Sequence, residues 1–187
     1  MSIDLPLIWA GVIAFGIFMY VVMDGFDLGI GILYPFFRDK DERDAMMNTV
    51  APIWDGNETW LVLGGAGLFA AFPLAYSVVL TALYLPLLIM LIALIFRGVA
   101  FEFRFKAKRT RHVWDAAFIW GSIVATFAQG VVLGAFIEGI KVENRQFAGG
   151  AFDWLAPFPL FCGAGLVAGY AMLGCAWLLM KTEGKLR

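Results

Sequence analysis

Long uncharged stretches constrain this chain more than any other feature. No Asp, Glu, Lys or Arg occurs between residues 59 and 96, and as one helix this stretch would measure roughly 57 Å, about twice the hydrocarbon thickness of a bilayer. The stretch must therefore fold back, and Pro73 marks the turn because proline disfavours helical backbone at Phe72. Only 16% of the residues are charged and 61% are hydrophobic, whereas soluble domains have about 25% charged residues. The chain is therefore predicted to be an all-α integral membrane protein.

The distribution of uncharged stretches predicts a polytopic transmembrane helix bundle with about five spans. The expected spans cover residues 6–35, 50–72, 76–97, 114–137 and 155–180. The second span needs about 20 residues before Pro73, so we expect it to begin near Thr49, with Asn48 or Thr49 as its cap. We interpret residues 1–187 as a single bundle. Its odd number of spans leads us to expect the N-terminal part of a longer subunit.

The basic residues predict the orientation of the bundle. All of the 14 Lys and Arg residues except Lys141 and Arg145 lie at the end of the third expected span or after the first, third or fifth. Because cytoplasmic loops are enriched in Lys and Arg, the N-terminus is predicted to be periplasmic. A net charge of −1 gives no support for nucleic-acid binding.

Four acidic residues lie within or beside the apolar stretches, namely Asp24, Asp27, Asp55 and Glu58. A carboxylate in hydrocarbon is costly and needs a partner, water or a proton. Asp24 and Asp27 share one helix face because they are three residues apart. The expected depth from the cytoplasm increases from Asp55, at about 9 Å, through Asp27 to Asp24, at about 20 Å. This order predicts a proton relay; the alternative is that these acids hold helices together by hydrogen bonding to caps and backbone groups.

Residues that commonly hold cofactors are scarce. His112 is the only histidine and lies outside the expected spans, so a haem in this chain would lack its usual axial ligand. The two cysteines do not form an iron–sulfur ligand cluster. We therefore expect no haem and no metal in this chain. A quinone or a lipid tail is a further candidate ligand among the many aromatic residues.

Three motifs resemble those of a known family. Residues 24–31 read DGFDLGIG, residues 51–61 read APIWDGNETWL and are followed by GLFAAFP at 67–73, and residues 96–104 read FRGVAFEFR. In this order and spacing they are similar to the second subunit (subunit II) of cytochrome bd-type quinol oxidases. The resemblance covers essentially the whole chain but about the first half of the family's usual length.

The resemblance implies a role in the bacterial respiratory chain. An enzyme of this family oxidises quinol and reduces oxygen to water in the cytoplasmic (inner) membrane. Its haems and quinol site would belong to a partner, subunit I, which this chain would support. The acid of the Trp-Asp-Gly motif, Asp55, would lie on a proton pathway, with Asp24 carried over from the Asp-Gly-Phe-Asp motif. Two alternatives remain open, namely half of a secondary transporter with intramembrane carboxylates and a purely structural scaffold subunit.

Overall fold

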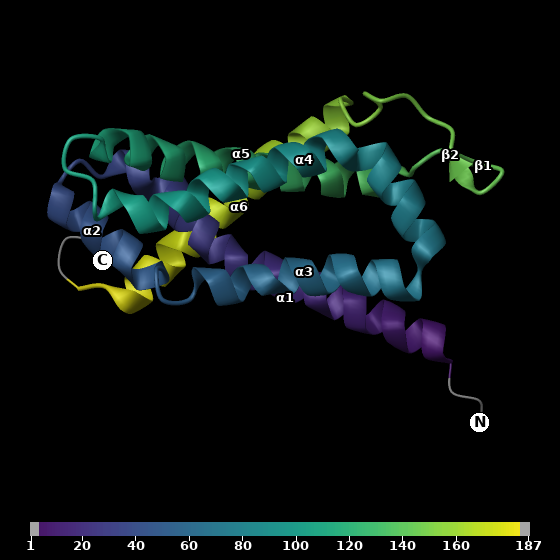
Figure 1. Ribbon diagram of the computed structural model, residues 1–187, viewed down its shortest axis with the longest axis horizontal. Coiled ribbons are helices and arrows are strands. Elements are labelled where there is room, and N and C mark those ends of the chain that lie inside the picture. The colour runs from purple at the N-terminus through teal and green to yellow at the C-terminus, as the bar shows by residue number, and fades with distance from the viewer. Residues whose placement is uncertain (1–3, 184–187) are drawn as a thin grey trace.

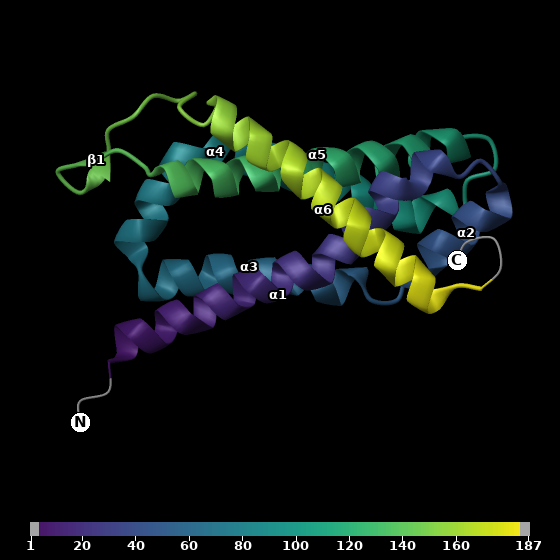
Figure 2. The same ribbon diagram turned by 180° about the vertical axis from the view of Figure 1, so that it is seen from behind.

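The computed structural model describes residues 4–183, which form a bundle of helices (Figures 1 and 2). In chain order the elements are α1 (Leu5–Leu33), the short 3-10 helix η1 (Tyr34–Phe36), α2 (Lys40–Val50), α3 (Trp54–Ala71), α4 (Pro73–Arg104), α5 (Arg111–Glu138), β1 (Val142–Glu143), β2 (Gln146–Phe147) and α6 (Pro157–Lys181). Within the described residues, four helical segments are long and apolar enough to cross a membrane: Leu5–Phe36, Pro73–Arg104, Arg111–Glu138 and Pro157–Lys181. The chain is thus an all-α polytopic membrane protein, as expected.

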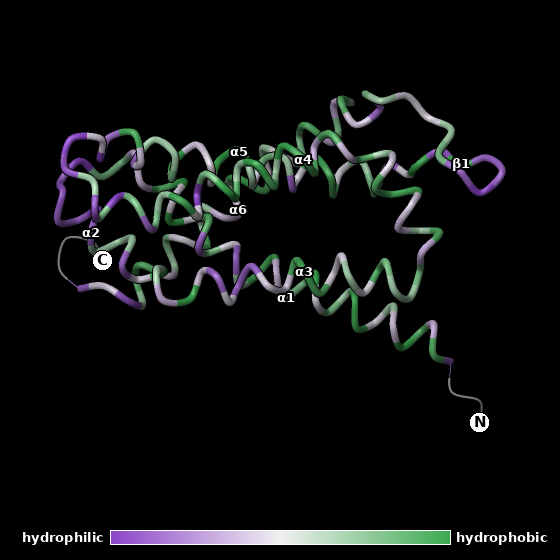
Figure 3. Tube along the Cα trace, viewed as in Figure 1, coloured by the Kyte–Doolittle hydropathy of each residue, from purple (hydrophilic) through white to green (hydrophobic). Residues whose placement is uncertain are grey.

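The distribution of hydropathy along the bundle fits a membrane setting. Hydrophilic residues gather at the end that carries α2 and at the tip of the β1–β2 hairpin, and apolar helices lie between (Figure 3). Helix α3 has 18 residues and lies beside α1 in both ribbon views, but it is not among the four apolar segments. The count of five spans and the periplasmic N-terminus therefore stay predictions.

Helices α1 and α3 form an antiparallel pair built on glycines. A Cβ at Gly64 would lie 3.2 Å from Ile17, and one at Gly67 would lie 3.1 Å from Ile13. A residue later in α3 therefore contacts a residue earlier in α1, which is the pattern of an antiparallel pair. Small residues let the two backbones approach closely, as is common between membrane helices.

Glycines also set the crossing of α1 with α6. A Cβ at Gly29 would collide with the backbone oxygen of Tyr170 and would lie 2.8 Å from the backbone nitrogen of Gly174. At Gly25, the nearest atom would be a ring carbon of Tyr170, at 2.9 Å. The half of α1 that carries Asp24 is therefore fixed in position by backbone contact with α6.

Helix α4 starts directly after Phe72, where α3 ends, so the predicted turn at Pro73 is confirmed. The helix bends at Leu83, whose φ of −115° and ψ of 15° are not helical, three residues before Pro86. It then continues to Arg104, seven residues beyond the expected end of the third span at residue 97. The apolar residues Ala100 and Phe101 extend its buried face over those last two turns.

The segment before α3 differs from the expectation. Residues 40–50 form a helix of their own, α2, because Asp39 caps it by accepting from the backbone N–H groups of Asp41 and Glu42. Helix α3 begins at Trp54 rather than near Thr49, and no side chain caps it. The Thr49 hydroxyl instead donates to the backbone oxygen of Met46 at 2.7 Å. The predicted cap at Asn48 or Thr49 is therefore wrong.

A short β-hairpin forms between α5 and α6. Val142 pairs with Phe147 and Glu143 with Gln146. Asn144 and Arg145 have φ values of 48° and 64°, which suit the two-residue turn of a tight hairpin. The hairpin lies at the opposite end of the bundle from α2 (Figure 1).

Candidate functional site

An ion pair lies buried in the middle of the bundle. Asp24 of α1 and Arg97 of α4 have no exposed side-chain surface, and the carboxylate Oδ1 lies 3.6 Å from the guanidinium Nη1. By the sequence alone, Arg97 belongs with the basic residues at the cytoplasmic end of the third expected span. In the structure α4 continues past Arg97 for seven more residues, and the side chain is buried. Arg97 is therefore a residue of the buried site that sequence reasoning missed.

Aromatic rings surround the Arg97 guanidinium. Its central carbon lies 5.9 Å from the ring centroid of Trp54 and 5.4 Å from that of Phe101. The two rings stack on each other with centroids 5.0 Å apart. Ring faces attract cations, and more strongly where water is excluded. Gly121 of α5 lets the α5 and α4 backbones approach closely here, since a Cβ at Gly121 would lie 3.0 Å from the backbone nitrogen of Arg97.

A second buried acid, Asp27, is joined to α3 through an amide. The Asn57 side chain donates to Asp27 Oδ2 at 2.7 Å and to the backbone oxygen of Met23 at 3.3 Å. Asn57 lies in the α3 turn that also carries Asp55 and Glu58. The polar turn of α3 therefore faces the polar turn of α1, although sequence reasoning did not select Asn57.

The four predicted acids differ strongly in burial. Asp55 is exposed in the first turn of α3, and Glu58, about one helical turn later, is half-buried. Asp24 and Asp27 are completely buried. The structure thus brings the two acids of α1 into the interior and leaves Asp55 at the surface of the described chain. Their role in proton transfer stays a prediction.

Many polar atoms of this central cluster have unused hydrogen-bonding capacity. Among the described residues, the buried side-chain atoms without a hydrogen-bonding partner include both oxygens of Asp24, Oδ1 of Asp27, the three guanidinium nitrogens of Arg97 and the hydroxyls of Tyr20 and Tyr170. Buried polar groups are normally paired, so such a concentration is unusual. Groups of this kind are able to hold protons and ordered water.

A different charge cluster ties α2 to α4 and α5. Arg104, only 1% exposed, donates to Asp44 Oδ1 at 2.6 Å and forms a second ion pair through its Nε with Asp115. Asp44 also pairs with Arg111, and Asp115 pairs with Arg43 at 3.3 Å. The Tyr34 hydroxyl donates to Asp115 as well, at 3.3 Å. We call this set the end network, and it accounts for the fixed position of α2.

His112, the only histidine of the sequence, is exposed in the first turn of α5, away from the central cluster. The absence of a haem from this chain stays a prediction. Across residues 4–183, no group of three or more His, Cys, Asp or Glu side chains is arranged to hold a metal ion. The central cluster combines two buried carboxyl groups with one buried arginine.

Known proteins resemble this chain over nearly its whole length. A family model described as cytochrome bd terminal oxidase subunit II matches residues 5–187. The cytochrome bd-I ubiquinol oxidase subunit 2 of Escherichia coli (strain K12) is 36% identical over 97% of this chain and 50% of its own length. The probable cytochrome oxidase subunit 2 of Haemophilus influenzae is 36% identical over 98% and 50%. The cytochrome bd ubiquinol oxidase subunit 2 of Bacillus subtilis is 32% identical over 98% and 55%. The chain therefore spans about half the length of the curated relatives it matches.

Proposed function

The chain belongs to the cytochrome bd terminal oxidase subunit II family, and from this membership we propose that it serves as a non-haem subunit of a bacterial terminal quinol oxidase. In this proposal it supports a haem-bearing subunit I in the cytoplasmic membrane. The assembled enzyme oxidises quinol and reduces oxygen to water. The names of the relatives support this function, since those reported above are oxidase subunits.

We further propose that the central cluster contributes to proton uptake. Asp55 is the entry group, because it is exposed and lies in the first turn of α3, about one turn before the half-buried Glu58. Asn57 links this turn to the buried Asp27, and Asp24 lies one helical turn further along α1. The route thus leads from the exposed Asp55 through the half-buried Glu58 to the two completely buried acids of α1.

Arg97 has a positioning role in this route. Its positive charge compensates a carboxylate at Asp24, which in a dry interior would otherwise be strongly unfavourable. The single observation that carries the proposal is the burial of Asp24 and Asp27 against the turn of α3 that starts at the exposed Asp55. A chain that needed only helix contacts has no requirement for carboxyl groups there.

The substitution Asp55→Asn in the complete oxidase complex tests this route. It removes the exchangeable proton but keeps the size of the side chain, so oxygen consumption with quinol should fall about tenfold or more, equivalent to at least about 1.4 kcal/mol on the barrier. The visible haem spectrum of the complex should stay unchanged. Asp41→Asn is a matched control, because Asp41 is also an exposed acid in the first turn of a helix, α2.

The outcomes separate the route from the alternatives. Normal turnover of Asp55→Asn with normal haem content would contradict the proton route. Reduced haem content, or loss of subunit I from the purified complex, would instead favour the scaffold alternative. The transporter alternative requires a preparation without haem, and the names of the reported relatives give it no support. A quinone or lipid bound to this chain stays a prediction.

A further inference from the structure

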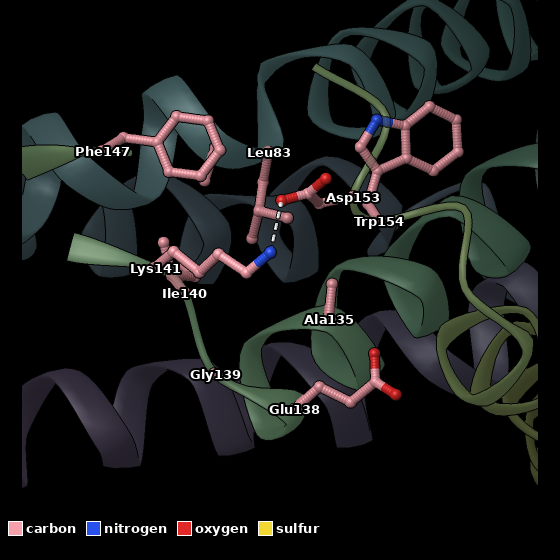
Figure 4. A pocket seen from close by; sticks show the side chains of 10 residues that line it. Leu83, Ala135, Glu138, Gly139, Ile140, Lys141, Phe147, Asp153 and Trp154 are labelled. Carbon is pink, nitrogen blue, oxygen red and sulfur yellow. Dashed lines mark ion pairs between the residues drawn. The ribbon is translucent and has the colours of Figure 1, made fainter. Parts of the chain in front are cut away.

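A cavity of about 420 Å³ lies at the end of the bundle opposite α2, far from the central cluster (Figure 4). Its walls come from the bend of α4, the end of α5, the β-hairpin and the turn before α6. The side chains that matter for its chemistry are those of Glu138, Lys141, Phe147, Asp153 and Trp154. By the distribution of basic residues, this end is predicted to face the periplasm.

The charged groups of the cavity are of both signs, with one more acid than base. Lys141 Nζ lies 3.9 Å from Asp153 Oδ2, as the dashed line in Figure 4 marks. The same Asp153 oxygen accepts from the backbone N–H of Gly150 at 3.0 Å, which fixes its position. Glu138 forms no ion pair with any side chain of residues 4–183 and also lines the cavity. The site therefore has a net charge of −1 and favours a ligand that contains a cation.

The bend of α4 adds a neutral acceptor to this wall. Pro86 has no backbone N–H, so the carbonyl of Ala82 cannot accept the usual helical hydrogen bond from residue 86. Ala82 and the non-helical Leu83 both line the cavity. A backbone carbonyl without its helical partner suits one of the several N–H donors of a primary ammonium group.

Two aromatic side chains complete the polar half of the site. Trp154 donates its indole N–H to the backbone oxygen of Ala151 at 2.9 Å, so its ring is held in the turn before α6. Phe147 is fixed by β2 and packs with Ala82 and Leu83. Aromatic rings beside carboxylates are a common setting for organic ammonium groups.

An apolar cavity of about 330 Å³ adjoins this site. It is lined by residues of α4 and α5, among them Val78, Val79 and Phe136, and it shares Ile140 with the charged cavity. Its lining is almost entirely apolar, and two of its side chains, those of Leu74 and Phe136, are exposed. A ligand that fills both cavities must therefore combine a charged head with a hydrocarbon tail.

We propose that this composite site binds one phospholipid with a primary ammonium headgroup, of the phosphatidylethanolamine class. The ammonium lies between Glu138, Asp153 and the Ala82 carbonyl, and the phosphate pairs with Lys141. An acyl chain follows the apolar cavity past Ile140. The site goes beyond the proposed oxidase function, because it uses none of the residues of the central cluster.

Lipid binding to the purified, delipidated complex tests the proposal directly. The complex is titrated with dioctanoyl phosphatidylethanolamine or dioctanoyl phosphatidylglycerol, and native mass spectrometry counts the bound lipids. One site should prefer the ethanolamine lipid by about tenfold, because only that headgroup supplies a cation to the carboxylates. Glu138→Gln combined with Asp153→Asn should abolish this preference, since both replacements keep the side-chain shape and remove the charge.

Further variants keep the outcome interpretable. Ala135→Trp fills the cavity and should remove the site for both lipids. Glu143→Gln is the matched control, an exposed acid of the same hairpin, and should leave binding unchanged. If the double variant does not assemble, Glu138→Gln alone should lower the preference at least about threefold. Equal affinity for the two lipids in the unaltered complex, or a full preference retained in the charge variants, would overturn the proposal.

Discussion

Two buried arginines of α4 lie seven residues apart, on the same side of the helix, and their surroundings differ. Arg97 faces one carboxylate, that of Asp24, at 3.6 Å, and its guanidinium nitrogens have no hydrogen-bonding partner among residues 4–183. Arg104 pairs with Asp44 and with Asp115, and each of these acids also has a second basic partner. The first arrangement is an isolated pair and the second is a shared network.

This difference teaches what each arrangement is suited to do. In the end network, the loss of one ion pair leaves each acid, Asp44 or Asp115, with another basic partner, so the structure tolerates change and holds α2 in place. In the central cluster, the charge of Asp24 depends on a single arginine, so one proton gained or lost alters the balance of the whole site. A carboxylate with a single basic partner therefore suits a group that must change its charge. A carboxylate that pairs with several basic residues suits a group that must keep its charge.

The largest expected effect follows from removing Arg97. Arg97→Leu leaves Asp24 buried without a counter-charge, and the free energy of unfolding should fall by about 3–5 kcal/mol. Adding Asp24→Asn should restore most of this loss, because the orphaned charge is then gone. Denaturant titration of the complex in detergent measures both variants. Strictly additive losses in the double variant would show that the two residues are not an isolated pair.

Arg104→Leu should have a smaller effect, about 2–3 kcal/mol, because it removes charged hydrogen bonds without orphaning either acid. Here Asp115→Asn should not restore stability, since Asp115 still pairs with Arg43 and Tyr34. The same titration applies. A rescue comparable to that of the Arg97 pair would mean that the end network is a pair like the central one, and the comparison would fail.

The position of the α1 acids depends on the crossing with α6, which Gly29→Ala tests. The added methyl group would meet backbone atoms of Tyr170 and Gly174, so overpacking should cost about 1–2 kcal/mol. Gly65→Ala is the control, because a Cβ there meets nothing within 4 Å of the described chain. Thermal unfolding of the two variants side by side measures the difference. If both variants unfold alike, α6 does not set the position of Asp24.

The smallest effect is expected at the exposed edge of the end network. Lys40 lies 3.8 Å from Asp44 with 68% of its side chain exposed, and exposed ion pairs contribute less than about 1 kcal/mol. Lys40→Gln should therefore change the unfolding free energy by no more than about 0.5 kcal/mol, most clearly at low salt. A loss as large as that of Arg104→Leu would place Lys40 inside the network rather than at its edge.

Local patterns were sufficient for much of the fold. The uncharged stretches predicted the long helices, and Pro73 predicted the turn between α3 and α4 because proline restricts its neighbours directly. The spacing of Asp24 and Asp27 placed both acids on one helix face. These features depend on residues close in sequence, so no knowledge of the tertiary structure was needed.

The missed features depend on distant partners or on weak local signals. Arg97 looked like the end of a span because a charge usually marks one, but its partner Asp24 lies on another helix. A signal was present, since Arg97, Ala100, Phe101 and Arg104 follow the helical spacing of a buried face. The α2 helix was missed because its charged sequence resembles a loop. Asp39, followed by two acids in the first turn, is the cap pattern that indicates it.

The distance in sequence between Asp24 and Arg97 has a consequence for biosynthesis. A ribosome adds about 5–20 residues per second, so the roughly 70 residues between the two take roughly 4 to 15 seconds to emerge. During that interval the first helix enters the bilayer before its counter-charge has been made. A nascent chain stopped before α4 should therefore be retained poorly in the membrane, and completion of α4 is the step that commits the first helix to its place.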